Sequence, residues 1–529
     1  NKLQIRPTKV THLCRGTRHE TKKTYITKGA SRHTILRWGG LVMGDRPNIL
    51  IFMPDQLRAD CVGCFGNPLV QTPHIDALAN RGTRFDNAWA NHPVCGPSRV
   101  NLMTGWYPHT RGHRTLTHLL SPQDPNLLKY LKEGGYQVAW AGARGDVFAP
   151  GVTEQSTHFC GWTTKPERKQ MGMGPQFNEG SALYDAFYHG IRASQSNWID
   201  FDEAATQTAI DWLESAPEGP WCLWVPLIFP HLPFEVEQPW YDLYANVDLP
   251  PRIARHGTNK PGFHDAIRSK LGTERVTEKQ WLEITRIYYA MISRVDDQLG
   301  RITAKLDQQN LNKNTLTYFF TDHGEYLGDF GLVEKWPSGL DRCLLQNPLI
   351  VAGPGVKEDA TASSFVEMVD ILPTILEQAS IPSTHTHFGK SLVPALKDHR
   401  AVIRDAAFSE GGFTTSEISL FEAANGEYAK KGQLQHEKPE LVGKAISLRN
   451  QDHTYVYRLY ESDELYNRIT DPDETNNIID LPETAATVAA LKEEVLDWLV
   501  ATTDNIPWDP DPRFPKIEHG QHEKFDPED

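Results

Sequence analysis

The stretch NILIFM at residues 48–53 decides the fold, and Pro54, Asp55 and Gln56 follow it at once. A short, continuous apolar run of this kind predicts a strand buried on both faces, as in a parallel sheet. Polar side chains just past such a strand lie at the sheet edge where open α/β proteins bind ligands. Asp55 and Gln56 are therefore the first candidates for a functional site.

The same pattern, an apolar run that ends in Gly, Pro or a polar cluster, recurs along the chain. It predicts further strands at residues 136–140, 221–229, 315–320 and 349–351. Helical spacing of apolar residues predicts helices at 74–81, 124–134, 201–215, 282–308 and 366–380. Alternating strands and helices predict an α/β protein with a large, mostly parallel sheet sandwiched by helices.

The pattern changes near residue 400. Residues 406–408, 445–448 and 454–460 are short, partly alternating runs that predict a small antiparallel sheet, and residues 485–499 predict a covering helix. We therefore expect three parts: an N-terminal extension at 1–42 without catalytic residues, a catalytic domain at 43–410, and a C-terminal α+β subdomain with a tail at 411–529.

Composition excludes several classes of function. The chain has 529 residues and a formal net charge of −14, so no surface for nucleic acid is expected. An acidic protein that binds an anion must gather its positive charge locally, in a pocket. The seven cysteines form no short repeating framework, which argues against a disulfide-stapled scaffold.

No segment reaches the roughly 18–20 apolar residues that span a membrane, so no membrane contact is expected. Residues 1–42 are polar and basic and lack the apolar core of a secretory signal. A cytoplasmic location is therefore favoured, and a periplasmic or secreted protein whose signal has been removed is the alternative. The sequence leaves the oligomeric state open and allows an oligomer.

One thiol is a candidate nucleophile. Cys95 is followed by Gly96 and Pro97, which predict a turn, and Arg99 comes shortly after. A reactive side chain with a guanidinium close behind it suggests a nucleophile that faces an oxyanion. The alternative interpretation is a partly buried structural cysteine, because short motifs also occur by chance.

Three other polar clusters follow predicted strands. They are Asp55 with Gln56, His231 within FPHLPF, and Asp322 with His323, trailed by Lys335. Carboxylates, a carboxamide and an imidazole at one sheet edge form an oxygen-rich site for a hard divalent cation, with one nitrogen ligand tolerated. Singly, each residue could be a helix cap or a turn residue, but together they predict a metal site.

Six segments occur in a fixed order: NILIFMPDQLRAD, QTPHIDALANRGTRFDNAWANHPVCGPSRVNLMTGWYPHTRG, FPHLPF, FFTDHGEYLGDFGLVEKW, VEMVDILPTIL and ELYNRITDPDETNN. Together they resemble the type I sulfatases of the alkaline phosphatase superfamily, from about residue 46 to about residue 480. The resemblance implies an alkaline phosphatase-like fold, with a mixed rather than wholly parallel sheet, and hydrolysis of sulfate esters.

The resemblance also implies roles for the candidate residues. Cys95 corresponds to the cysteine that a formylglycine-generating enzyme oxidises to 3-oxoalanine (formylglycine). Asp55, Gln56, Asp322 and His323, with the modified Cys95, match the ligands of one divalent cation, normally Ca²⁺. Arg99 matches the arginine that steadies the formylglycine hydrate, His231 the histidine beside the substrate's bridging oxygen, and Lys335 the lysine that holds the sulfate.

These roles imply a mechanism. A hydrated aldehyde carries two hydroxyls on one carbon, and one of them, deprotonated with the help of the cation, attacks sulfur in line. The cation and Lys335 hold the non-bridging oxygens, and His231 protonates the departing alcohol. The second hydroxyl then expels sulfate and regenerates the aldehyde, which a serine could not do.

Two positions depart from the family pattern. Gln56 stands where many relatives carry a second Asp, so one negative charge is lost and Mn²⁺ becomes an alternative to Ca²⁺. After the strand that ends at Gly142, relatives carry a Lys followed by His or Asp, but this chain reads ARGD at residues 143–146. We expect Arg144 to contact the sulfate and Asp146 to act as a base; the alternative is a solvated surface loop.

The substrate is encoded less clearly. The segment WYPHTRGHR at 106–114, which includes His109, Arg111 and His113, could contact a sulfated sugar or an anionic aglycone, or could be a packed helix end. We expect a small-molecule or saccharide sulfate ester, aryl or carbohydrate. Three other functions compete: a phosphonate monoester or phosphodiester hydrolase with the same nucleophile, a non-catalytic binding protein on the same scaffold, and a hydrolase that uses the unmodified Cys95 thiol.

Overall fold

A computed structural model describes residues 46–142, 146–163, 177, 180–192, 200–253 and 257–505. These residues belong to one compact unit. Among them, no helix is both long and apolar enough to cross a membrane. The predicted extension at 1–42 lies outside the described residues, and the predicted domain boundary near residue 410 stays a prediction.

The centre of the unit is an eight-stranded sheet with the order β11-β2-β10-β9-β1-β7-β4-β5. β1 (Asn48–Met53) lies between β7 (Trp221–Pro226) and β9 (Thr315–Phe320), and both run parallel to it. β4 (Gln137–Ala141) and β5 (Phe159–Gly161) extend the parallel part beyond β7.

The other side of the sheet contains the antiparallel pairs. β10 (Leu349–Ala352) runs antiparallel to β9 and to β2 (Gly82–Phe85), and β11 (Ala360–Ala362) runs parallel to β2. The expected mixed, mostly parallel sheet is therefore confirmed. The apolar run at 349–351 could not give this direction, because parallel and antiparallel buried strands share the same apolar pattern.

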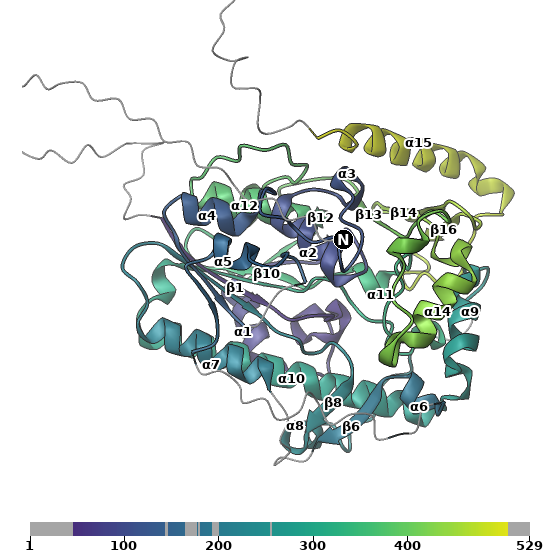
Figure 1. Ribbon diagram of the computed structural model, residues 1–529, viewed down its shortest axis with the longest axis horizontal. Coiled ribbons are helices and arrows are strands. Elements are labelled where there is room, and N and C mark those ends of the chain that lie inside the picture. The colour runs from purple at the N-terminus through teal and green to yellow at the C-terminus, as the bar shows by residue number, and fades with distance from the viewer. Residues whose placement is uncertain are drawn as a thin grey trace, which may run out of the picture. The chain divides into compact units, whose positions relative to one another are not determined.

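Helices cover both faces of the sheet, which explains why β1 is apolar throughout. Leu50 and Phe52 belong to one hydrophobic core, whereas Ile49, Ile51 and Met53 belong to a second. Figure 1 shows α7 (Phe201–Glu214) and α10 (Glu278–Gln308) on one face, and α2 (Cys95–Thr104), α4 (Leu127–Glu133) and α12 (Ile371–Gln378) on the other. A strand between two such layers needs apolar side chains in both directions.

Side-chain caps fix where several helices begin. Thr277 and Gln280 form a reciprocal capping box at the start of α10. The Asp200 side chain accepts from the Glu203 amide at 2.9 Å at the start of α7. Each cap satisfies an amide that has no partner within the helix. The helix predicted at 366–380 is too long, because Val366–Glu367 form β12 and α12 begins only at Ile371.

The segment that carries Cys95 differs from its prediction as a turn. Cys95 is the first residue of α2, and Pro97 lies in the first turn, where the missing amide hydrogen has no helical partner to lose. All residues of α2 are buried, and Gly105 ends the helix at a φ of 68°. The thiol is therefore held at the N-terminus of a rigid, buried helix.

The C-terminal part contains the predicted small antiparallel sheet. Its strands are β13 (Ala407–Gly411), β14 (Ala445–Arg449), β15 (His453–Arg458) and β16 (Glu464–Asn467). α15 (Ala485–Thr502) packs beside it through Leu491, Val495 and Trp498 (Figure 1). β16 was not predicted, since four residues carry too little alternation. α14 (Ala429–Glu437) lies in the connection between β13 and β14.

Candidate active site

The loops that follow β1 and β9 carry the predicted metal ligands, and hydrogen bonds tie the two loops together. Thr321 Oγ1 donates to the Pro54 carbonyl at 3.0 Å and accepts from the Leu57 amide at 3.1 Å. The Gln56 amide donates to Asp322 Oδ1 at 3.1 Å. Because β1 and β9 are neighbours in the sheet, residues far apart in the chain meet at one edge, as predicted.

Four buried side chains converge at this edge. Asp55, Cys95, Asp322 and His323 place one ligand atom each within 4.8 Å of one another. His323 Nδ1 donates to the Gly324 carbonyl at 2.9 Å, so the lone pair of Nε2 faces Cys95 Sγ at 3.0 Å and Asp55 Oδ1 at 3.7 Å. Two carboxylates and one neutral imidazole nitrogen fit a divalent cation, so the residues present suit the implied metal.

Arg99 orients the two carboxylates. Its Nη2 lies 2.6 Å from Asp55 Oδ2 and its Nε lies 2.8 Å from Asp322 Oδ2. The guanidinium therefore takes one oxygen of each aspartate, and the other oxygens stay near Cys95 and His323. Burial and the Asp322 charge raise the pKa of Asp55. Although burial opposes it, Arg99 lowers the pKa of Asp322.

The Cys95 thiol is almost fully buried in this setting. Only 4% of the residue is exposed, and its Sγ lies 3.6 Å from Asp55 Oδ1. Burial, followed by the charge of Asp55, raises the pKa of the thiol far above its ordinary value. A thiol in this state is a poor nucleophile.

The side-chain carbonyl oxygen of Gln56 points toward the site because a glutamate on the opposite side binds the side-chain nitrogen. Nε2 donates to Glu325 Oε2, and Oε1 accepts from Lys335 Nζ at 2.8 Å. Glu325 Oε1 also accepts from the backbone amides of Leu327 and Glu334. One lone pair of the Gln56 carbonyl is thus used by Lys335, and the second is left for a ligand bond.

His231 and Lys335 meet beside the carboxylate group. His231 Nδ1 donates to the Leu232 carbonyl at 2.7 Å, and Nε2 accepts from Lys335 Nζ at 3.0 Å. Burial and the neighbouring Lys335 lower the pKa of His231 to about 3. The imidazole is therefore neutral near pH 7 in the absence of substrate, with Nε2 facing the site.

A pocket of about 530 Å³ opens onto Cys95, His231 and Lys335. Its apolar walls are formed by Leu116, Pro337, Phe413, Leu420, Phe421 and Tyr428. Its charged walls are paired: Arg114 forms an ion pair with Glu417, and Lys431 with Glu334 and Glu422. Much of the pocket is therefore built from the segment that follows β13, well after the predicted catalytic motifs.

The structure brings some of the predicted substrate contacts to this pocket and leaves others elsewhere. Asp146 lines it, whereas Arg144 lies outside the described residues. His109 binds Glu410 and Thr502, Arg111 stacks over Trp106, and His113 bonds to the His118 carbonyl. None of these three lines the described pocket, although Arg114 and residues 115–117 of the same segment do. His109 instead packs against β13 and α15.

Several site residues were missed by sequence reasoning. Glu325 and Glu334 stand inside the quoted segment FFTDHGEYLGDFGLVEKW, so their neighbourhood was recognised but their roles were not. Phe413, Phe421 and Lys431 belong to a region without a recognisable motif. A buried lysine between acidic neighbours gives no sequence signal, because surface helices show the same composition.

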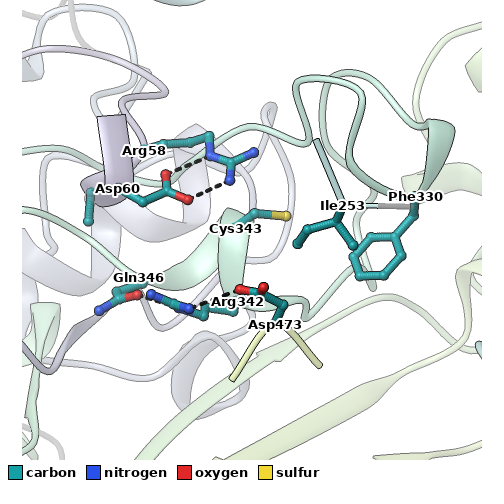
Figure 2. Close-up of a pocket in the computed structure, with 9 residues that line it drawn as sticks. Arg58, Asp60, Ile253, Phe330, Arg342, Cys343, Gln346 and Asp473 are labelled. Atoms are coloured by element: carbon teal, nitrogen blue, oxygen red, sulfur yellow. Dashed lines mark hydrogen bonds and ion pairs between the residues drawn. The ribbon is translucent and has the colours of Figure 1, made fainter. Parts of the chain in front are cut away.

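A second, smaller pocket is lined by other residues. Figure 2 shows Arg58 and Asp60 on one side and Arg342 with Asp473 on the other, with Cys343 between them. Its volume is about 20 Å³, enough for roughly one water molecule. Both guanidinium groups are already paired, Arg58 with Asp60 and Asp329, and Arg342 with Asp473. We assign no substrate to this pocket.

Comparison with known proteins gives the class of enzyme that this fold and site define, a sulfuric ester hydrolase with the alkaline phosphatase-like fold. Residues 47–381 match the model of the family described as Sulfatase. Because the match covers more than half of the chain, the protein belongs to the sulfatase family, as its sequence segments predicted.

Relatives of similar length are named as sulfatases, and a solved structure of similar length shares the fold. The uncharacterized sulfatase YidJ of Escherichia coli (strain K12) is 26% identical over 473 residues, which cover 86% of this chain and 87% of that protein. The choline-sulfatase of Rhizobium meliloti (strain 1021) is 26% identical over 472 residues, 83% of each chain. The phosphonate monoester hydrolase of Agrobacterium radiobacter superimposes with a TM-score of 0.70 at 24% identity and covers 87% of this chain and 96% of that one, which shows the shared fold.

Proposed function

We propose that this sulfatase hydrolyses its ester through formylglycine made from Cys95 and one divalent cation. The observation that carries the proposal is the position of Cys95 Sγ, 3.0 Å from His323 Nε2 and 3.6 Å from Asp55 Oδ1, in the wall of the pocket. The thiol is the precursor and stands in for the oxygen atoms of the modified side chain. Its conversion requires a formylglycine-generating enzyme as partner.

Asp55, Gln56, Asp322 and His323 would hold the cation, with Ca²⁺ as first choice and Mn²⁺ as alternative. The bound cation supplies charge stabilisation for the sulfate and lowers the pKa of a nearby hydroxyl. The hydrated aldehyde supplies a nucleophilic hydroxyl and a second hydroxyl that permits release of sulfate.

The chain's own residues bind the ester and move the proton. Lys335 Nζ, which points to Gln56 Oε1 and His231 Nε2, is placed to hold a non-bridging sulfate oxygen. His231 Nε2 faces the same space. It is unprotonated in the free protein, so it must first take up a proton, for which Lys335 Nζ is the neighbouring donor at 3.0 Å, before it can protonate the departing alcohol. Arg99 orients Asp55 and Asp322 and favours their ionised forms. Asp146, on the pocket wall, is retained as a second candidate base.

The pocket favours an alcohol with an aromatic or apolar face. Arg114 and Lys431 are engaged in ion pairs, and leucine, proline and aromatic side chains form most of the uncharged lining, beside a few polar residues such as Thr115 and Asn425. Flat apolar walls of this kind suit an aryl sulfate. A saccharide sulfate whose sugar presents an apolar face is the second candidate.

A phosphonate monoester or phosphodiester hydrolase with the same nucleophile is the alternative function. Two observations favour it: the Asp55–Gln56 pair in place of two aspartates, and the likeness in fold to a phosphonate monoester hydrolase. Both reactions need an anion held beside the same nucleophile, so the site geometry accommodates either.

One experiment separates these functions. An aryl sulfate and the matching aryl phosphonate are compared with Ca²⁺, Mn²⁺ or a chelator, on protein whose Cys95 peptide has been characterised by mass spectrometry. We expect a higher kcat/KM for the sulfate and activity in proportion to the formylglycine content. A dominant phosphonate rate would favour the alternative, and full activity with an intact thiol would contradict the formylglycine mechanism.

A further inference from the structure

One lysine from the C-terminal part of the chain reaches the active site. Lys431 lies in α14, is 5% exposed, and places Nζ 2.6 Å from Glu334 Oε2 and 3.2 Å from Glu422 Oε2. Its partner Glu334 is 97 residues earlier in the chain. The proposed mechanism gives Lys431 no role, although the residue lines the pocket at Cys95.

Glu334 connects Lys431 to Lys335. Its Oε1 lies 2.8 Å from Lys335 Nζ, while its Oε2 binds Lys431. Glu334 has a φ of 69°, which is uncommon for a residue other than glycine, and its backbone amide donates to Glu325 Oε1 at 2.5 Å. A residue other than glycine keeps such a positive φ only where the surrounding structure holds its backbone in place. Glu325 therefore holds the Glu334 backbone, while Lys431 and the Lys335 backbone amide, which donates at 2.6 Å, both hold Glu334 Oε2.

The ammonium group of Lys335 has three donors, and each has a partner. They point to Glu334 Oε1 at 2.8 Å, Gln56 Oε1 at 2.8 Å and His231 Nε2 at 3.0 Å. Of the three partners, only Glu334 carries a full negative charge. Because a lysine side chain is long and flexible, this ion pair is the strongest restraint on where Nζ lies.

We propose that Glu334 and Lys431 are positioning residues: Lys431 clamps the Glu334 carboxylate, and Glu334 holds the Lys335 ammonium where it meets the sulfate. This inference rests on the proposed function, in which Lys335 binds the sulfate. The ion-paired group in the pocket wall contains two lysines, Lys335 and Lys431, and two glutamates, Glu334 and Glu422, so its positive and negative charges are equal in number. Loss of Lys431 would leave the Lys335 backbone amide as the remaining partner of Glu334 Oε2, so the carboxylate would shift and draw the Lys335 ammonium away from the substrate.

A Lys431→Met variant tests the clamp, because methionine has similar bulk and no charge. We expect kcat/KM for a sulfate ester to fall about 10- to 100-fold, since small displacements of catalytic groups cost factors of this size. KM and the inhibition constant of inorganic sulfate should both rise. Lys431→Arg should recover most of the loss, and Glu334→Gln should reproduce it.

Lys430→Met is the matched control. Lys430 is the preceding residue of α14 and pairs with Asp185 at 2.6 Å, away from the pocket residues described. We expect kcat, KM and the inhibition constant of this variant to match those of the parent protein.

Thermal unfolding with and without inorganic sulfate gives a second readout. The increase in Tm on adding sulfate should shrink in Lys431→Met and stay unchanged in Lys430→Met. A variant with a lower Tm but the parent's KM and sulfate inhibition constant would show a structural role and overturn the proposal. If Lys431→Met does not fold, Glu334→Gln decides by the same measurements. A parent protein that turns over no sulfate ester would contradict the proposed function instead.

Discussion

His231 is the residue whose role depends most on its neighbour. Its Nδ1 hydrogen is fixed on the Leu232 carbonyl, so only Nε2 can exchange a proton with a substrate. Lys335 donates to that same atom in the free protein. A bound sulfate would compete for the Lys335 ammonium and leave Nε2 facing the ester oxygen. In the proposed mechanism, the tautomer fixed by the backbone would make Nε2 the nitrogen that serves the reaction.

Replacing His231 should affect poor leaving groups most. We expect His231→Gln to lower kcat for an alkyl sulfate by about 10²–10⁴-fold, the usual range for general acid catalysis, and to lower it far less for 4-nitrophenyl sulfate. A nitrophenolate leaves without a proton, so it does not need the imidazole. The measurement is kcat across a series of leaving groups of different pKa. Equal losses for all esters would contradict proton donation by His231.

Among individual residues, the sequence could predict those site residues that directly follow buried strands. Asp55, Asp322 and His323 stand directly after β1 and β9, and strand adjacency alone brings them together. It could not predict Lys431, because the contact of this residue with Glu334, 97 residues earlier, depends on how α14 packs in the folded chain. His109 was placed in the substrate region from its polarity, but Glu410 and Thr502 satisfy both ring nitrogens away from the described pocket.

Among the elements, the loop after β9 is restricted by its contact with a neighbouring segment. The Gly324 amide donates to the Leu344 carbonyl at 2.7 Å, and a Cβ at this position would meet the carbonyl oxygen of Cys343. We expect Gly324→Ala to destabilise the fold by about 1–3 kcal/mol, as overpacking does, and to weaken cation binding, because His323 must shift. Thermal unfolding and calcium titration measure the two effects. Unchanged values of both would contradict a tight fit here.

β6 (Tyr188–Arg192) pairs with β8 (Phe234–Glu237), and a histidine in β6 that lies beside two carboxylates should make the stability of the fold depend on pH. His189 lies 3.4 Å from Glu235 and 3.6 Å from Glu427. Burial alone would lower the pKa of His189, but these carboxylates raise it to about 9. Because the folded pKa exceeds the ordinary 6.5, the stabilisation is complete below pH 6.5 and is lost as pH rises through 9.

We expect this loss to reach about 1–3 kcal/mol, since one pKa unit corresponds to about 1.4 kcal/mol and solvent screens part of the interaction. Urea unfolding at several pH values measures the free energy of unfolding. His189→Gln should flatten the slope between pH 6.5 and 9.5, and His399→Gln, outside this ion pair, should not. A variant that keeps the parent's slope would contradict the assignment.

The elements themselves were largely predictable, and the exceptions share a cause. Continuous apolar runs gave β1, β7 and β9 because both faces of the sheet are covered. The direction of β10 and the helix at Cys95 depend on long-range packing instead. Gly96 and Pro97 favour a turn locally, yet the N-terminal turn of a buried helix accepts them equally well.

For the whole molecule, cation binding should stabilise the fold. Asp55 and Asp322 are crowded and buried, and Arg99 offsets only part of their repulsion. We expect added Ca²⁺ to raise the free energy of unfolding by about 2.7 kcal/mol at 100 times its Kd, and chelation to reverse this. The measurement is Tm against Ca²⁺ concentration. Asp322→Asn should lose most of the shift, and a parent protein indifferent to Ca²⁺ and Mn²⁺ would contradict the metal site.

The order of strands in the central sheet also determines how long β1 waits for its neighbours during synthesis. β1 leaves the ribosome early, but its neighbours β7 and β9 follow much later. Cys95 meets His323, which is 228 residues further on. At about 5–20 residues per second, roughly 10–45 s pass between the two residues. During that interval the nascent chain cannot close around Cys95, so the proposed formylglycine-generating enzyme would have access to a side chain that the finished fold buries.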